Sequence, residues 1–319
     1  MTGKEPSTTL CSNTSHHAGG RYLIWKKLID RFARTVLGCA ASVSIFTMVA
    51  IVIVLGTETY SFFQLEEVSV SDFFLGTEWS PLLGAQKHFG IWPLICGTLL
   101  VTLVASLISI PLGVVSAIFL AEYAPPIVRN FFKPMLEILA GVPTVVYGFF
   151  ALTVITPALQ SIWSGIDFYN ALSAGLAVGI MCIPIVCSIS EDTIRSVPNS
   201  LREGAYALGG TKLDTSLKVV FPSALSGIVS ACLLSIARAI GETMIVALAA
   251  GNLAQLTLNP GAQVQTMTAY MVQIFLGDTD AIGVEYKSSY AVAATLFVMT
   301  LSLTLIGAIV TKRYKEVYN

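Results

Sequence analysis

Two ionisable residues lie four positions apart in a long apolar stretch. Arg238 and Glu242, followed by Thr243, fall within a run over residues 222–251 that is predicted to cross a membrane as one helix. An arginine near the centre of a bilayer costs about 2.5 to 3.5 kcal/mol on insertion scales, so its side chain should face a bundle interior or a wet cavity. A guanidinium offers a fork of donors that fits an oxyanion such as phosphate. This position therefore predicts an anion pathway in which Arg238 attracts the anion.

Glu242 is expected to lie on the same helical face as Arg238, because residues four apart are neighbours on a helix. There it would hold the guanidinium in position, keep it from binding the anion too tightly or, when protonated, donate to a phosphate oxygen. Thr243 is expected to add a hydroxyl donor. The alternative is a mutual ion pair that only holds helices in register, although such buried pairs often add little net stability.

The rest of the chain has the composition of a membrane protein that would position these residues. Of its 319 residues, 55% are hydrophobic and 12% are charged, against roughly 25% charged residues in soluble domains. One membrane crossing needs about 20 apolar residues. The chain is therefore predicted to be an all-α membrane protein with six transmembrane helices, at residues 36–56, 91–121, 138–160, 171–189, 222–251 and 290–311.

The distribution of basic residues predicts the orientation of these helices. Fifteen of the 18 lysines and arginines fall in segments that would lie on one side of the membrane, and only Lys87 and Lys287 would lie on the other. Since basic residues are enriched in cytoplasmic loops, both termini are predicted to be cytoplasmic. The cytoplasmic segments then include the tail 1–35, the loop 190–221 and the tail 312–319, and the first external loop is 57–90.

The cytoplasmic loop before the fifth span carries start and stop signals for two short helices. Ser200 and Glu203 fit a capping box that would start the first helix. Gly209 opens a Gly-Gly pair that is expected to end this helix in a left-handed conformation. Thr211 and Asp214 fit the start of a second helix. The loop is therefore predicted to place two short amphipathic helices across the cytoplasmic mouth of the bundle.

Small residues along the first of these helices suggest a docking surface. Gly204, Ala205 and Gly209 would let another backbone approach closely, as a helix requires when it must sit in a partner's cleft. The alternative interpretation is an ordinary amphipathic helix on the protein surface.

The same residues resemble a known family. Glu203-Gly204-Ala205, three residues, Gly209, nine residues and then residues 219–222 (VVFP) form a pattern similar to the EAA loop of ATP-binding-cassette (ABC) importer permeases. In that family the loop is the coupling helix that seats on an ATPase subunit, so the resemblance gives this role to Glu203, Gly204, Ala205 and Gly209. The chain has no GxxxxGK[ST] motif. ATP hydrolysis is therefore expected on a separate polypeptide.

A second resemblance narrows the family. Residues 237–243 (ARAIGET), with the following Met-Ile-Val and the later Gly251-Asn252, are similar to PstC-type permeases of phosphate ABC importers. In the sibling PstA-type permeases, Ala-Pro usually follows the GET run. Further similar segments are residues 74–81, 97–99, 121–125 and 136–148, so the resemblance covers about residues 70 to 310. It implies a type I ABC importer permease in the bacterial cytoplasmic (inner) membrane.

The resemblance also implies an assembly of several chains. The chain would pair with a PstA-like permease subunit and contact two PstB-like ATPase subunits, which would bind ATP and magnesium. A PstS-like phosphate-binding protein would deliver inorganic phosphate from outside. The chain itself would hold no cofactor or metal, would bind no nucleic acid and would not be an enzyme.

Other functions are considered against this prediction. A permease for sulfate or molybdate would share the coupling loop but need not place Arg238 and Glu242 together, and a PstA-type permease would share the run that contains Arg238 and Glu242. A transporter driven by an ion gradient would show inverted repeats, and no convincing internal repeat is present. A membrane-embedded enzyme would need an HExxH motif, an aspartate pair or a Ser/Lys arrangement within the spans, which the sequence lacks.

Overall fold

The computed structural model describes residues 16–81, 87–277 and 283–313. The chain divides into two units, Met1–Gly56 and Thr57–Asn319. The boundary falls within the first helix, α1 (His16–Phe63), which has 48 residues. At 1.5 Å per residue this helix is about 72 Å long. The basic part of the predicted tail 1–35 and the predicted first span 36–56 therefore belong to one continuous helix.

The second unit is built from helices and one very small sheet. Strands β1 (Trp79–Ser80) and β2 (His88–Phe89) pair antiparallel, with Trp79 opposite Phe89. The helices before the predicted coupling loop are α2 (Val70–Leu75), α3 (Trp92–Ile118), η1 (Phe119–Tyr123), α4 (Pro126–Ala140), α5 (Thr144–Phe150), η2 (Ala151–Ile155), α6 (Thr156–Ile162) and α7 (Ala171–Ser196). Those that follow are α8 (Asn199–Ala207), α9 (Lys212–Thr215), η3 (Ser216–Val220), α10 (Phe221–Ile240), α11 (Met244–Ala249), α12 (Met267–Leu276) and α13 (Val284–Arg313). The three η segments are π-helical turns.

Six helical segments of the described residues are long and apolar enough to cross a membrane. They are Ile29–Phe63, Trp92–Tyr123, Thr144–Ile162, Ala171–Ser196, Lys212–Ile240 and Val284–Lys312. Their number and helical character confirm the predicted fold class of an all-α membrane protein with six spans. Several bounds differ from the prediction, and two of the predicted spans are interrupted. Residues 141–143 separate α4 from α5, and the predicted fifth span, 222–251, is two helices because α10 ends at Ile240.

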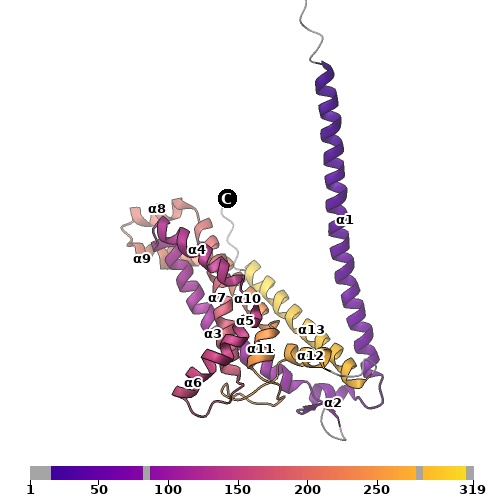
Figure 1. Cartoon of the computed structure of the whole chain (residues 1–319). Helices are drawn as coiled ribbons and strands as arrows, with labels where there is room; N and C mark the ends of the chain where they lie inside the picture. Colours follow the sequence, from indigo (N-terminus) through magenta and orange to yellow (C-terminus); the bar gives the residue numbers. More distant parts are fainter. Residues whose placement is uncertain (1–15, 82–86, 278–282, 314–319) are drawn as a thin grey trace, which may run out of the picture. The chain divides into compact units, whose positions relative to one another are not determined.

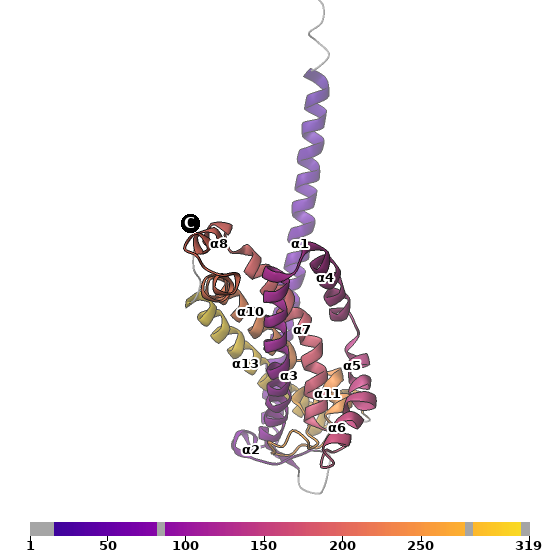
Figure 2. The ribbon, with the colours of Figure 1, turned by 90° about the vertical axis from the view of Figure 1, so that its left-hand side faces the viewer.

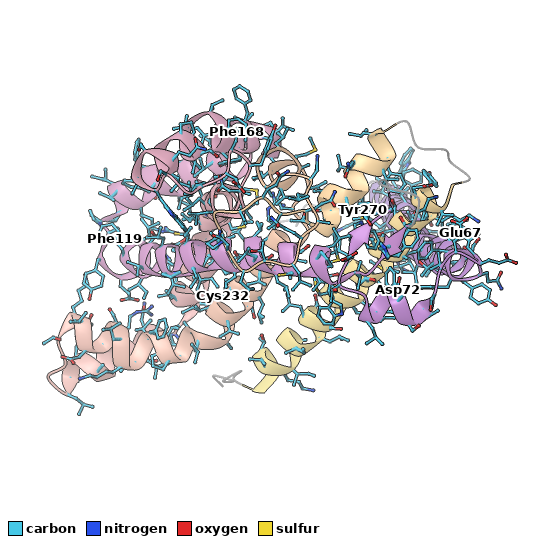
Figure 3. All side chains as sticks on the ribbon, turned by 90° about the horizontal axis from the view of Figure 1, so that it is seen from below. Glu67, Asp72, Phe119, Phe168, Cys232 and Tyr270 are labelled. Carbon is cyan, nitrogen blue, oxygen red and sulfur yellow. The ribbon has the colours of Figure 1, made fainter. Side chains whose placement is uncertain are left out.

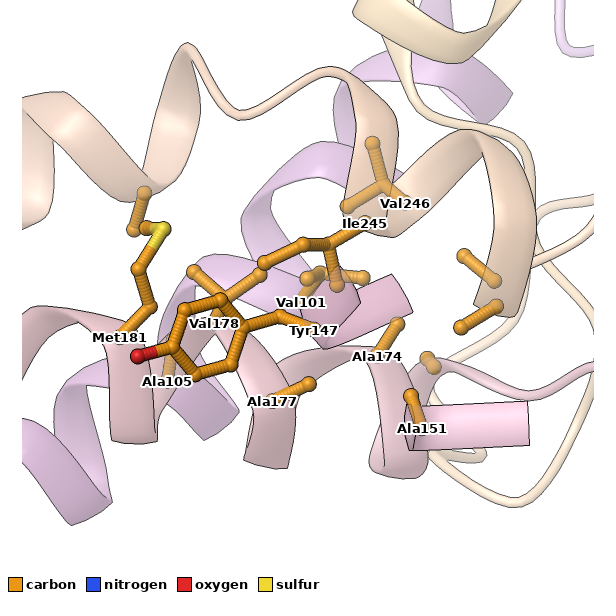
Figure 4. Packing of buried hydrophobic residues seen from close by; sticks show 14 of the residues in the cluster. Val101, Ala105, Tyr147, Ala151, Ala174, Ala177, Val178, Met181, Ile245 and Val246 are labelled. Atoms are coloured by element: carbon orange, nitrogen blue, oxygen red, sulfur yellow. The ribbon is translucent and has the colours of Figure 1, made fainter. Parts of the chain in front are cut away.

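Helix α7 forms the centre of the bundle and packs closely against α3. A Cβ atom on Gly175 would lie 2.6 Å from the Cβ of Val104, and one on Gly113 would lie 2.6 Å from the Cβ of Val186. Small residues of this kind let membrane helices approach closely. Figure 4 shows how Val101 of α3, Val178 of α7 and side chains of α5 and α11 meet in the apolar cluster beside this contact.

The two ends of the bundle have different structures. Helices α8 and α9 lie at one end of α3, α7 and α10, and α2 and α6 lie at the other (Figures 1 and 2). The α2 end carries a second apolar cluster, in which the rings of Trp79 and Tyr270 meet edge to face at 4.9 Å between centroids. Figure 3 shows Phe119, the first residue of η1, at the opposite end of α3 from Tyr270 and Asp72. The predicted coupling loop and the small sheet are thus held far apart by rigid helices.

Candidate functional site

The helix of the predicted fifth span is interrupted at residues 241–243, within the predicted anion site. Helix α10 ends at Ile240, Gly241 is its C-cap, and α11 begins at Met244. The prediction that Glu242 lies one turn after Arg238 on the same helical face is therefore wrong. The groups of Glu242 bind residues of the two helices that follow, which stabilises the break. Thr268 of α12 donates its hydroxyl to the Glu242 carbonyl oxygen at 2.6 Å, and Ile245 donates its backbone N–H to Glu242 Oε1 at 3.3 Å.

Glu242 is buried, with 6% of its surface exposed. The first turn of any helix leaves backbone N–H groups without partners inside the helix. The Glu242 carboxylate satisfies one of these groups in α11, and its carbonyl group binds α12. Glu242 thus joins the end of α10 to the two short helices that follow.

Arg238 has a different environment. It lies in the last turn of α10, is exposed, and its Nη2 lies 3.6 Å from the sulfur of Met181 on α7. Within the part of the chain that the structure describes, no ion pair joins Arg238 to Glu242 or to any other carboxylate. The alternative that these two residues only form a mutual ion pair is therefore wrong for the described chain. Apart from the Nη2 contact with the Met181 sulfur, the guanidinium is therefore not held by a carboxylate of the described residues.

Thr243 makes a local contact, since its hydroxyl donates to the Gly241 carbonyl oxygen at 3.3 Å. Its predicted role as an additional donor to an anion stays a prediction.

Two polar residues near Arg238 were missed in the sequence. Ser235 lies one turn before Arg238 on α10, is buried, and its hydroxyl lies 3.4 Å from that of Ser109 on α3. Its spacing of three from Arg238 was a signal that could have found it.

The loop that carries the second predicted site forms two short helices, α8 and α9. The prediction of a capping box at Ser200 and Glu203 is wrong. Helix α8 starts earlier, with Pro198 at the N-cap, and has no side-chain capping bond. The Pro198 carbonyl instead accepts from the Leu201 N–H at 3.2 Å, which places Ser200 inside the first turn. The Glu203 side chain is thereby free of this role and exposed.

The other two local signals are confirmed. Gly209 has φ +82°, the left-handed conformation that ends α8 and that residues with a Cβ rarely adopt. Thr211 caps α9, since its hydroxyl oxygen accepts from the Asp214 N–H at 3.2 Å.

The surface of α8 is open in the described chain. Glu203, Gly204 and Gly209 are exposed, and Ala205 is half-buried. A Cβ atom on Gly204 or Gly209 would meet no atom within 4 Å. The packing of this chain therefore does not require glycine at position 204. The apolar side chain of Leu208 is 92% exposed, which is unlike an amphipathic helix that buries its apolar face on its own bundle.

A buried carboxylate near this loop was also missed in the sequence. Glu191 of α7 is 2% exposed and receives hydrogen bonds from Arg129 Nε at 2.7 Å and Lys133 Nζ at 3.0 Å, both on α4. Lys133 also binds Asp192 at 2.7 Å. The hydrogen bond to Asp192, with a further contribution from Glu191, raises the pKa of Lys133 above its ordinary value. These ion pairs fasten α4 to the end of α7 that precedes α8.

Six helices long and apolar enough to cross a membrane, and an exposed pair of short helices at one end of α3, α7 and α10, are the architecture of a type I ABC importer permease. Solved structures agree. One chain of a bacterial ABC transporter that imports the acidic polysaccharide alginate matches with a TM-score of 0.62, over 92% of this chain and 99% of that chain, at 13% identity. A chain of the MetNI methionine ABC transporter matches with a TM-score of 0.53, over 71% of this chain and 95% of that chain, at 16% identity. At these identities the likeness shows the fold alone.

Sequence comparison identifies the family. The chain belongs to the binding-protein-dependent transport system inner membrane components, whose family model matches residues 109–316. It is 34% identical over 290 residues to the probable ABC transporter permease protein YqgH of Bacillus subtilis, covering 91% of this chain and 93% of that protein. It is 33% identical over 283 residues to the phosphate transport system permease protein PstC of Mesorhizobium japonicum, covering 81% of this chain and 85% of that protein. These findings confirm the resemblance predicted from the motifs and identify a multi-pass inner membrane protein.

Proposed function

We propose that this chain is one of two permease subunits of an ATP-driven importer of inorganic phosphate and forms half of the translocation pathway. The observation that carries the proposal is Arg238, a guanidinium within the fifth span that has no carboxylate partner in the described chain. Relatives that cover most of the chain and are described as phosphate transport system permeases support this substrate.

The chemistry of Arg238 suits an oxyanion in transit. An anion that leaves water needs a fixed positive charge, and a guanidinium can form two parallel hydrogen bonds to phosphate. A guanidinium already bound to a carboxylate would have to break that pair first. Because the Glu242 carboxylate accepts the Ile245 N–H and does not pair with Arg238, the charge of Arg238 is available to the substrate. In the proposed dimer, the exposed side of Arg238 would face the pathway shared with the second permease.

Glu242 would serve this pathway by shaping it. Ile245 and Thr268 both donate hydrogen bonds to Glu242, and these bonds would hold α11 and α12 beside the end of α10. We assign Glu242 a positioning role, and we retain Thr243 as a minor donor to the anion. A permease for sulfate or molybdate remains the second candidate, because Arg238 fits any tetrahedral oxyanion and specificity would come from groups around it.

ATP hydrolysis would be coupled to transport through α8. Glu203, Gly204, Ala205 and Gly209 would form the surface that seats on a separate ATPase chain, which would bind ATP and magnesium. Gly204, whose added Cβ would meet no atom of the described residues within 4 Å, supports an interface with a partner. The complete importer would contain a PstA-like permease, two PstB-like ATPases and a PstS-like phosphate-binding protein. Both termini and α8 would then be cytoplasmic, as the basic residues predict.

Uptake of radiolabelled phosphate into liposomes tests the proposal. The chain would be reconstituted with its partner permease, ATPase and binding protein, and unlabelled phosphate, sulfate and molybdate would be compared as competitors. Phosphate alone should compete effectively. Competition by sulfate or molybdate at lower concentrations than phosphate would favour the second candidate, and phosphate uptake that persists without the ATPase would contradict an ABC importer.

A further inference from the structure

A single arginine of α8 binds two separate segments of the bundle, η1 and the end of α7. Arg202 donates from Nη2 and Nε to Glu122 Oε1 of η1, at 2.9 Å and 3.2 Å. The same guanidinium donates to the carbonyl oxygens of Ile194 and Val197 at the end of α7. Since the last carbonyl groups of a helix have no partner inside it, Arg202 completes the end of α7 and joins it to η1.

This ion pair is buried although it lies beside an exposed loop. The side chain of Arg202 is 15% exposed and that of Glu122 is 7% exposed. Both exchange bonds with water for bonds with each other, so a defined geometry is needed to make the pair favourable. The two residues are 80 positions apart in sequence, and the pair therefore fixes a long-range relation between α8 and the end of α3.

The second short helix contacts the same turn. Lys212 begins α9, and its Nζ lies 5.0 Å from the ring centre of Tyr123. This distance is within the range of a cation–π contact. Arg202 and Lys212 lie on opposite sides of the Gly209 turn, yet they hold consecutive residues, Glu122 and Tyr123. Both helices of the coupling loop are thus attached to η1.

The turn that receives these contacts has an unusual backbone. The N–H of Ala124 donates to the carbonyl oxygen of Phe119 at 2.8 Å, a π-helical bond that spans five residues instead of four. Such π-turns are frequent at functional sites. Here the turn ends the long helix α3, which packs along α7 and contacts α10. A displacement of η1 is therefore passed to α3, which spans the bundle.

Apolar packing does little to hold α8 in place. None of its residues is buried, and Leu201 is its member that packs against the neighbouring apolar cluster. The polar contacts of Arg202 consequently set the position of α8 relative to the spans. A helix fastened in this way moves together with η1 and with the end of α7 when a partner pushes it.

We propose that Arg202 and Lys212 are positioning residues that transmit movement of the coupling loop to Glu122 and Tyr123, and through them to α3. The inference rests on the proposed function, since it presumes an ATPase seated on α8. It adds a specific path. The ATPase would act on the pathway through the contacts of Arg202 with Glu122 and of Lys212 with Tyr123, which we call the clamp. The docking residues Glu203 and Gly204 would not be part of this clamp.

The test measures how many ATP molecules are hydrolysed for each phosphate imported by the reconstituted importer. Arg202→Met should leave the amount of copurified ATPase unchanged, because the docking surface remains. ATP hydrolysed per phosphate should rise about tenfold, within the range found for mutations that alter energetic coupling. Glu122→Gln should give a smaller rise, because the amide oxygen still accepts one hydrogen bond, and Lys212→Met should give a smaller rise still.

Two further variants make the test specific. Lys218→Met removes a lysine of the same loop whose side chain is 76% exposed and pairs with Asp214; it should behave as wild type. The double variant Arg202→Met with Glu122→Gln should show the same ratio as Arg202→Met alone, since residues that act through one contact are not additive. If Arg202→Met does not assemble, Arg202→Lys and Glu122→Gln carry the test, with the same direction of change expected.

Several results would overturn the inference. An unchanged ratio of ATP to phosphate in Arg202→Met, or in both conservative variants, would show that the clamp transmits nothing. Loss of copurified ATPase in Arg202→Met would place Arg202 in docking and not in transmission. Fully additive effects in the double variant would separate Arg202 from Glu122. If the wild-type complex imports no phosphate, the proposed function fails first, and this outcome is distinguishable from a failure of the clamp.

Discussion

Two arginines of this chain, Arg202 and Arg238, serve the coupling loop and the fifth span in different ways. Arg202 binds a carboxylate and two carbonyl oxygens, and its side chain is nearly buried. Arg238 has a thioether as a neighbour, and no carboxylate pairs with it among the described residues. A guanidinium whose donors are used by its own chain fixes the relative position of helices. One that no carboxylate neutralises can bind an anionic ligand.

The largest expected effect is on Arg238. Arg238→Ala should lower phosphate uptake at least about thirtyfold, because truncating one partner of a desolvated charged contact costs about 2 to 5 kcal/mol. The rate of radiolabelled phosphate uptake into liposomes measures this effect. Leu234→Ala changes an exposed residue one turn earlier on α10 and should keep uptake near wild type. If Arg238→Ala imports phosphate at the wild-type rate, Arg238 does not line the pathway. The proposed difference in role between Arg238 and Arg202 would then be wrong.

The next effect concerns docking. Glu203→Lys reverses a charge on the exposed surface of α8 and should lower the ATPase that copurifies with the permease by about tenfold, since unfavourable charges at an interface cost several kcal/mol. Glu137→Lys makes the same change on an exposed residue of α4 and serves as the control. Full ATPase binding in Glu203→Lys would show that α8 does not seat on the ATPase through this residue.

A smaller effect is expected at Glu242, because its oxygen accepts a backbone hydrogen bond and does not neutralise Arg238. Glu242→Gln retains an acceptor and should lower uptake by no more than about fivefold, the equivalent of one hydrogen bond. Glu242→Ala loses the acceptor and should lower uptake further. Equal and complete loss in both variants would mean that the negative charge itself is required, which the positioning role does not predict.

The smallest effect is expected at Thr243. Its hydroxyl already bonds to Gly241, and Thr243→Val preserves the shape of the side chain while it removes the hydroxyl. The apparent KM for phosphate should change by less than about twofold, as for substitutions without a large structural mechanism. A rise of the KM well above this, with an unchanged maximal rate, would show that Thr243 is a major ligand of the anion and not a minor donor.

The sequence predicted the parts of this structure that depend on local chemistry. The membrane spans follow from long apolar runs, and the stop at Gly209 and the start at Thr211 follow from residues that are close in the chain. The failed capping box is also local. Pro198 starts α8 before Ser200 can cap it, and a signal of two polar residues cannot show which of two adjacent starts is used.

The parts that could not be predicted depend on distant partners. The apolar character of residues 222–251 continues across the break after Ile240, so hydropathy shows one span. The break is stabilised by Thr268, which lies 26 residues after Glu242. Arg202 and Glu122 are 80 residues apart, and neither has a local pattern that would indicate their pairing.

The length of α1 has a consequence for how much of the chain the bilayer can cover. The hydrocarbon core of a membrane is about 30 Å thick, so about 20 of the 48 residues of α1 suffice to cross it upright. More than half of this helix then extends beyond the hydrocarbon core of an upright crossing. Its basic residues Arg31 and Arg34 precede the apolar segment, and a chain shortened before Ile29 would still retain a complete membrane anchor.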